Sequence, residues 1–219
     1  EADRAAARAA LEEWARGTDD HARHAAGDLA ELDMLCGRGH AADERLARLL
    51  TDGASDALAV RALRLRAEAA ERQGDLDGAV AQLDAAVRRL PGDLDLRFAR
   101  AMLLLKVGRV DEARADTRLV AEDRYRGVQA ALLGGIVKLQ SGDPNGAVAD
   151  FQLVAANGAT SPLAHLWLGL GLLATSDDVD AAMAAFASAV DLDPRFTMGL
   201  LARAAGALRA GWWDVAVQH

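Results

Sequence analysis

The sequence is poor in the residues that build sheets, disulfides and basic surfaces. Among its 219 residues there are one cysteine, one isoleucine and two lysines, and only 4% are aromatic. Because β-branched and aromatic residues favour strands while alanine and leucine favour helices, the composition predicts an all-α fold. The single cysteine, Cys36, excludes an intrachain disulfide. We expect it to be a small buried side chain and not a nucleophile.

Long apolar runs are also missing. The longest, "LAHLWLGLGLLA" at 163–174, is too short to span a bilayer, and the chain does not open with a basic and then apolar signal segment. The net charge of −8 repels phosphate backbones and anionic lipid. We therefore expect neither nucleic-acid binding nor direct membrane insertion. A cytoplasmic location is expected, with a periplasmic or exported domain as the alternative.

Small residues recur with a fixed period along most of the chain. The first such column consists of glycines 34 residues apart, Gly74, Gly108 and Gly142. A column of alanines keeps nearly the same step, at Ala79, Ala113, Ala147, Ala182 and Ala216. A third column lies earlier, in the first helix of each repeat, at Ala67, Ala101, Gly135 and Gly169. A period of this length is typical of helical repeats, in which each repeat is one supersecondary unit.

The chemistry of these columns predicts a helical hairpin in each repeat. Each glycine of the first column is expected to end one helix in a left-handed conformation. An Asp or Asn three residues later, at Asp77, Asp111 and Asn145, is expected to cap the next helix. Small residues let two helix backbones approach closely. The segments "LGG" at 133–135 and "GLG" at 169–171 are therefore interpreted as packing positions and not as phosphate-binding loops.

The pattern resembles the tetratricopeptide repeat family. The resemblance is clearest over 165–194, where Gly169, Ala182, Phe186 and Pro194 occupy the places that the family fills with a small residue, alanine, an aromatic residue and proline. The resemblance implies a right-handed α-solenoid of helix–turn–helix repeats, an alpha-alpha superhelix. Four repeats are predicted at 60–93, 94–127, 128–161 and 162–196. A degenerate repeat at 22–59 precedes them, after an N-terminal helix and connection at 1–21, and an incomplete sixth repeat follows at 197–219.

The resemblance further implies that the first helices of the repeats line a concave groove that binds another protein. One stripe of these helices provides the candidate contact residues, which are charged at one end and apolar over the rest. The candidates are Arg61, Arg64, Glu68, Phe98, Met102, Leu105, Leu132, Ile136, Leu139, Leu166, Leu170 and Leu173, with Leu201 next in register. The predicted function is a non-enzymatic scaffold that holds a helix or peptide of a partner protein in this groove.

Other interpretations of the groove and of the chain stay open at this point. The apolar trough could instead be filled by another segment of the same protein, filled by a second copy through self-association, or closed by tight curvature of the superhelix. The chain could also be the regulatory or sensor arm of a larger enzyme or signalling ATPase, whose catalytic part lies outside these residues.

No residue pattern predicts catalysis, a metal site or a cofactor. His21 and His24 are three residues apart and could touch one ion, but no third ligand has suitable spacing, so a solvated helix face is the preferred interpretation.

At the other end of the chain, Gly211 and Ala216 keep the register of a sixth repeat. Trp212 falls at an exposed register position, where we expect it to contact a continuation of the chain or a partner.

Overall fold

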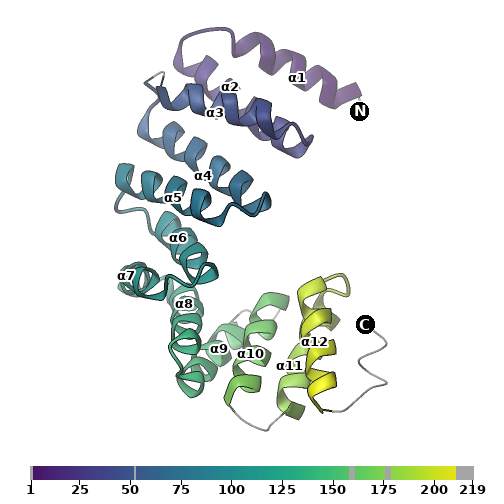
Figure 1. The fold of residues 1–219 in the computed structure, drawn as a ribbon. Coiled ribbons are helices and arrows are strands. Elements are labelled where there is room, and N and C mark those ends of the chain that lie inside the picture. The colour runs from purple at the N-terminus through teal and green to yellow at the C-terminus, as the bar shows by residue number, and fades with distance from the viewer. Residues whose placement is uncertain (1, 52, 158–160, 176–178, 211–219) are drawn as a thin grey trace. The chain divides into compact units, whose positions relative to one another are not determined.

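The chain folds into α-helices. The structure is a computed structural model that describes residues 2–51, 53–157, 161–175 and 179–210, and these residues form twelve helices and no strand (Figure 1). The first six helices are α1 (Ala2–Trp14), α2 (Asp20–Leu35), α3 (Gly39–Thr51), α4 (Asp56–Arg72), α5 (Leu76–Arg89) and α6 (Leu94–Lys106). The others are α7 (Val110–Ala121), α8 (Gly127–Gln140), α9 (Pro144–Asn157), α10 (Pro162–Thr175), α11 (Val179–Leu192) and α12 (Thr197–Ala210). Among the described helices, none combines the length and the apolar composition that a bilayer span requires.

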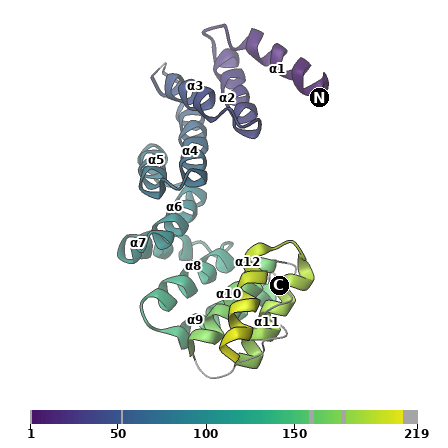
Figure 2. The same cartoon turned by 45° about the vertical axis from the view of Figure 1, so that its right-hand side comes forward.

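The helices pack as successive hairpins within two compact units, Glu1–Leu103 and Leu104–His219. In the first unit α1 packs on α2, α2 on α3, α3 on α4 and α4 on α5, and α2 also contacts α4 (Figure 2). In the second unit the same order holds from α7 to α12, and α10 contacts both α8 and α12. The all-α repeat architecture expected from the sequence is confirmed. The boundaries of the repeats stay a prediction, because the helices define the hairpins and not the point at which one repeat gives way to the next.

The core of the first unit is built from aliphatic side chains of helices that follow one another. One cluster joins α2, α3 and α4, and it is formed by Ala30, Ala42, Leu46, Leu49, Leu58, Ala62 and Leu65. A second cluster joins α4, α5 and the start of α6, and it is formed by Val60, Leu63, Ala86, Val87 and Leu96. The side chains of α4 thus belong to both clusters, which makes α4 the central helix of this unit.

Two glycines set the helix packing in the second unit. A Cβ atom added to Gly135 in α8 would lie 2.5 Å from the Phe151 ring in α9, and one added to Gly169 in α10 would lie 2.4 Å from the Phe186 ring in α11. Both phenylalanines are fully buried. The prediction that "LGG" and "GLG" are packing positions is therefore confirmed, since each glycine admits an aromatic ring from the paired helix.

The turn glycines have the expected conformation, but the helix caps lie elsewhere than predicted. Gly74, Gly108 and Gly142 have φ of 81°, 78° and 82°. Asp75 and Asp143, directly after a glycine, cap the next helix through side-chain bonds of 2.9 Å to the amides of Gly78 and Gly146. The prediction that the residue three positions after the glycine is the cap was wrong. Asp77 and Asp111 lie in the first helical turn, where a carboxylate still favours the helix dipole.

Replacing Gly74 with alanine should lower the free energy of unfolding by about 1 kcal/mol. No neighbour lies within 4 Å of the added Cβ, so the whole loss comes from the left-handed backbone. Gly92 is the matched control, because its surroundings are equally open and its φ is not positive. Urea unfolding of Gly74→Ala and Gly92→Ala measures the difference. Equal stabilities of the two variants would contradict the left-handed conformation of Gly74.

The lone cysteine is placed differently from the sequence-based prediction. Cys36 follows the last residue of α2 and is exposed, not buried. It lies in the C-cap position, where its backbone amide bonds to the carbonyl of Leu32 at 3.0 Å. The error arose because a cysteine at a helix end does not lie on the buried face that a small apolar residue would occupy within the helix.

Candidate functional site

The charged end of the predicted stripe lies on α4 in the first unit. Arg61 is held in a fork, with Nη1 2.7 Å from Asp28 and Nη2 2.7 Å from Glu31, both on α2. The hydrogen bond to Glu31 raises the pKa of Arg61 above its usual value against the opposing effect of burial, and Asp28 adds to the increase. Arg61 therefore ties α4 to α2 with its guanidinium already paired. Its acidic partners were not identified from the sequence.

The next residues of the stripe differ in how accessible they are. Arg64 is exposed and makes no ion pair with another described residue, whereas Glu68 lies 3.5 Å from Arg72 on the same helix. Phe98 and Met102 on α6 are half-buried. In this unit, Arg64 is thus the cation of the stripe that can reach a partner without breaking an internal ion pair.

In the second unit the stripe contains both core and surface residues. Leu105, Ile136 and Leu166 are buried. Leu166 packs in a cluster with Met183 and Phe186. Four other members are half-buried, namely Leu132, Leu139, Leu170 and Leu173. A buried side chain contributes to folding and has little surface left for a partner, so the half-buried residues are the ones available for contact.

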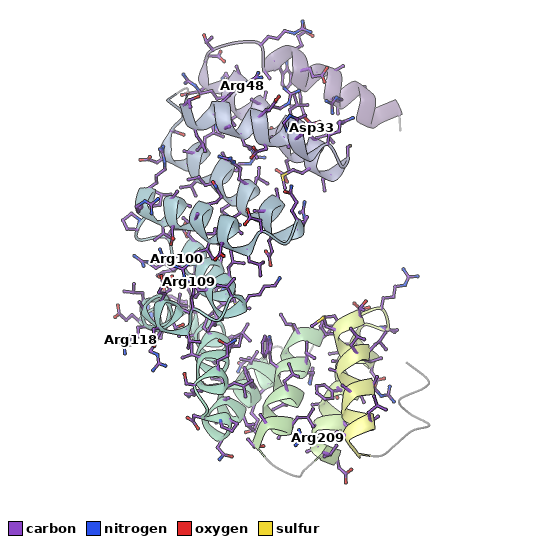
Figure 3. The ribbon with its side chains drawn as sticks, in the orientation of Figure 1. Asp33, Arg48, Arg100, Arg109, Arg118 and Arg209 are labelled. Atoms are coloured by element: carbon purple, nitrogen blue, oxygen red, sulfur yellow. The ribbon has the colours of Figure 1, made fainter. Side chains whose placement is uncertain are left out.

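An exposed row of apolar residues on α12 continues the stripe through Leu201. Met198, Leu201 and Leu208 are 59%, 61% and 49% exposed, and Ala205 between them is also exposed. At 100° per residue these four positions fall on one face of the helix. Arg209 donates a 3.2 Å hydrogen bond to the carbonyl of Leu173, which ties the end of α12 to the end of α10 (Figure 3). We call Met198, Leu201, Ala205 and Leu208 the α12 face.

The stripe predicted from the sequence contains Leu201 but not Met198 or Leu208. The repeat spacing in the sequence could have identified both residues, because Met198 lies 35 residues after Leu163 and Leu208 lies 35 residues after Leu173. This is the same step that separates Ala182 from Ala147. Leu163, the corresponding residue of α10, is also exposed. Extending Leu166, Leu170 and Leu173 by one repeat gives Leu201, Ala205 and Leu208, and extending the Arg61 position through every repeat gives Leu163 and then Met198.

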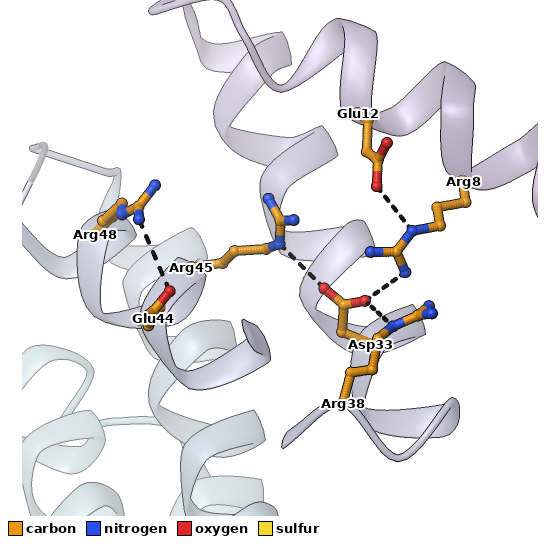
Figure 4. Close-up of polar contacts among 7 residues, drawn as sticks. All are labelled: Arg8, Glu12, Asp33, Arg38, Glu44, Arg45 and Arg48. Atoms are coloured by element: carbon orange, nitrogen blue, oxygen red, sulfur yellow. Dashed lines mark hydrogen bonds and ion pairs between the residues drawn. The ribbon is translucent and has the colours of Figure 1, made fainter. Parts of the chain in front are cut away.

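A buried carboxylate organises the start of the first unit. Asp33 on α2 is fully buried and accepts hydrogen bonds from Arg8 at 2.5 Å, Arg38 at 2.9 Å and Arg45 at 3.1 Å (Figure 4). Burial by itself would raise the pKa of Asp33, but the three arginines outweigh it and hold that pKa below its usual value. Arg8 also pairs with Glu12 at 2.8 Å. The cluster thus joins α1, α2 and α3 by charge.

Two remaining sequence predictions concern a metal and the end of the chain. Within the described ranges, no group of three His, Cys, Asp or Glu side chains is placed to hold a metal ion. His21 and His24 are exposed on α2. Trp212 lies outside the described residues, so its predicted contact stays a prediction.

Several solved structures align with most of this chain. A tetratricopeptide repeat protein from Parabacteroides merdae aligns with a TM-score of 0.76 at 14% identity, covering 89% of this chain and 74% of that one. PilW, a type IV pilus biogenesis factor, aligns with a TM-score of 0.73 at 19% identity, covering 90% of each chain. A thermophilic repeat protein of Thermus thermophilus gives 0.67 at 19% identity, covering 85% of this chain and 99% of that one.

Sequence comparison gives the family directly. No curated protein matches the chain. The family model described as "Tetratricopeptide repeat" matches residues 37–93, 65–129 and 132–195, which together make up more than half of the 219 residues. With the hairpins, the turn glycines and the small-residue columns all in this register, the chain belongs to the tetratricopeptide repeat family.

Proposed function

We propose that this protein is a non-enzymatic scaffold that binds a helix or peptide of a partner protein through the apolar stripe of its first helices. The tetratricopeptide repeat fold is generally that of a protein-interaction scaffold. The observation that carries the finer proposal is the α12 face, where Met198, Leu201 and Leu208 are exposed in one row. Contiguous exposed apolar side chains of this kind mark interaction sites.

The chemistry of the face favours an amphipathic helix or an extended peptide with apolar anchors. The four residues of the α12 face are all uncharged. Half-buried Leu170 and Leu173 lie on α10, which contacts α12, and extend the apolar character of the second unit. A partner segment that buries leucine-like side chains here gains about 25 cal/mol for each Å² of apolar surface removed from water.

Replacing Leu208 with aspartate should abolish capture of the partner from a lysate of the source cells. The substituted carboxylate would have to be desolvated against apolar side chains in the complex. Leu153→Asp is the matched control, because Leu153 on α9 is a leucine with the same exposed fraction of 49% and lies off the stripe. Affinity capture with mass spectrometry measures both, with helix content checked by circular dichroism.

We expect the wild type and Leu153→Asp to capture the same partner protein, and Leu208→Asp to lose it. Retention of every captured protein by Leu208→Asp would overturn the proposal. The buried Ile136 is unsuitable for this test, because an aspartate there would disrupt the core instead of the surface.

If light scattering shows that the wild type self-associates and Leu208→Asp does not, the α12 face is occupied by a second copy of the chain and the proposed partner is wrong.

A further inference from the structure

Three arginines line a small cavity beside the Asp33 cluster in the first unit. The cavity has a volume of about 120 Å³ and contains side chains of Arg23 from α2 and of Arg45 and Arg48 from α3. Its remaining lining is a leucine, three alanines and Gly17 from the connection between α1 and α2. None of the described residues that line it is acidic. The chain has a net charge of −8, yet this lining contains three cations, and the acids beside them, Asp20, Asp33 and Glu44, are not part of it.

The acidic partners of these arginines leave most of the guanidinium donors unused. Arg45 bonds to Asp33 through Nε at 3.1 Å, and its terminal nitrogens point away from that carboxylate (Figure 4). Arg48 lies 3.9 Å from Glu44, beyond hydrogen-bond distance. Arg23 uses Nη1 on the exposed Asp20 at 2.8 Å. Each guanidinium has five N–H donors in a planar fork, so the three arginines that line the cavity keep several donors that no described residue accepts.

Asp33 also fixes the geometry of one wall. Because its carboxylate is buried and holds Arg8, Arg38 and Arg45 together, the side chain of Arg45 is positioned before any ligand arrives. Preorganisation of this kind lowers the entropy lost on binding. Arginine forks match the spacing of oxygen atoms in phosphate groups and form charge-assisted hydrogen bonds with them.

We propose that the cavity lined by Arg23, Arg45 and Arg48 binds a phosphate group. The volume of about 120 Å³ accommodates a tetrahedral oxyanion. The group can arrive as inorganic phosphate or as a phosphate monoester on a partner segment. This site is separate from the α12 face and does not depend on the proposed function.

Inorganic phosphate in a Tris chloride buffer is the first probe, with sodium chloride at equal ionic strength as the reference. Calorimetric titration should show saturable binding of phosphate to the wild type. Thermal unfolding should show a matching stabilisation, because a ligand that binds only the folded state raises its stability. Arg48→Gln and Arg23→Gln should each weaken phosphate binding about tenfold or more, since each removes a charged hydrogen-bond donor. Arg45 is left intact because its loss would also disturb Asp33.

Arg72→Gln is the matched control. Arg72 is an exposed helical arginine that lies 3.5 Å from Glu68 four residues earlier, as Arg48 lies near Glu44, but it does not line the cavity. Its phosphate affinity should equal that of the wild type. An equal and non-saturable response in the wild type, Arg48→Gln, Arg23→Gln and Arg72→Gln would overturn the proposal, because it would reflect only the general stabilisation that phosphate gives to folded proteins.

A second arm distinguishes the two sources of the group. Titration with O-phosphoserine, with serine as the blank, should give saturable binding that Arg48→Gln weakens if the natural ligand is a phosphate monoester. Binding of inorganic phosphate without binding of O-phosphoserine would support the site and assign it to the free ion. Failure of both probes to bind the wild type would refute the site, whatever the outcome of the Leu208→Asp experiment.

Discussion

Replacing Asp33 with asparagine should lower the free energy of unfolding by about 3 kcal/mol, at the lower end of the range for breaking a buried ion pair. The asparagine keeps the shape of the side chain but loses the charge that Arg8, Arg38 and Arg45 share. The three guanidiniums would then repel one another without a carboxylate between them. Because they are partly exposed, water relieves some of that repulsion, which is why the lower end is expected. Urea unfolding at neutral pH measures the loss.

Asp43→Asn is the matched control for this prediction. Asp43 on α3 pairs with Arg66 at 2.7 Å, but its side chain is 52% exposed. Exposed ion pairs contribute at most about 1 kcal/mol, so this variant should stay within that limit. If Asp33→Asn were no more destabilising than Asp43→Asn, the cluster would not be the electrostatic centre of the first unit.

The same cluster predicts a pH dependence with a definite sign. The pKa of Asp33 is lowered in the folded state, so the folded state binds its proton less readily than the unfolded state does. The stabilisation by Asp33 is therefore complete above the unfolded pKa, which is about 4, and is lost as the pH falls through the lower folded pKa. The difference in stability between wild type and Asp33→Asn should stay constant from pH 7 to about 5 and shrink below about 4.

Replacing Gly135 with alanine should lower the free energy of unfolding by about 1–3 kcal/mol, the range for overpacking a core. An alanine within a helix normally gains about 1 kcal/mol over glycine. Here the new Cβ would lie 2.5, 2.8 and 3.0 Å from three carbon atoms of the Phe151 ring. Because that ring is fully buried, it has no solvent into which it can move. The clash should therefore outweigh the gain in helix propensity.

Gly127→Ala is the control for this substitution. Gly127 lies at the start of the same helix, α8, with nothing within 4 Å of the added Cβ, and the variant should be as stable as the wild type or slightly more so. Phe151→Leu should relieve part of the clash, so the double variant with Gly135→Ala should be less destabilised than the sum of the two single changes. A thermal melt in which Gly135→Ala is as stable as Gly127→Ala would rule out the tight contact.

The columns of small residues were informative because they report local packing. Gly135 faces Phe151 and Gly169 faces Phe186 within single hairpins, and each pair lies 16 or 17 residues apart in the sequence. Where the corresponding second-helix residue is the smaller Leu83, the first-helix residue is Ala67. At these places, the larger second-helix residue accompanies the smaller first-helix residue. Contacts of this short range repeat with the period of the hairpin, which is why they can be recognised in the sequence.

The Asp33 cluster could not be predicted in this way. Its arginines come from α1, from the turn after α2 and from α3, at separations from Asp33 of 25, 5 and 12 residues. These separations match neither a helix period nor the repeat. The position also lies in the degenerate part of the chain, where no column of the later repeats predicts a buried acid. Only the packing of three helices brings the four side chains together.

The sequence by itself determined the helical hairpins, their register and the left-handed glycines between them, because these depend on residues within one repeat. The tertiary structure decided which members of the stripe are accessible. Ile136 and Leu170 hold the same place in successive first helices, yet Ile136 is buried and Leu170 is half-buried. Leu201 keeps the register of Leu166 and is exposed while Leu166 is buried. Exposure depends on the helices that pack alongside, and this information is not contained in the periodicity of a single helix.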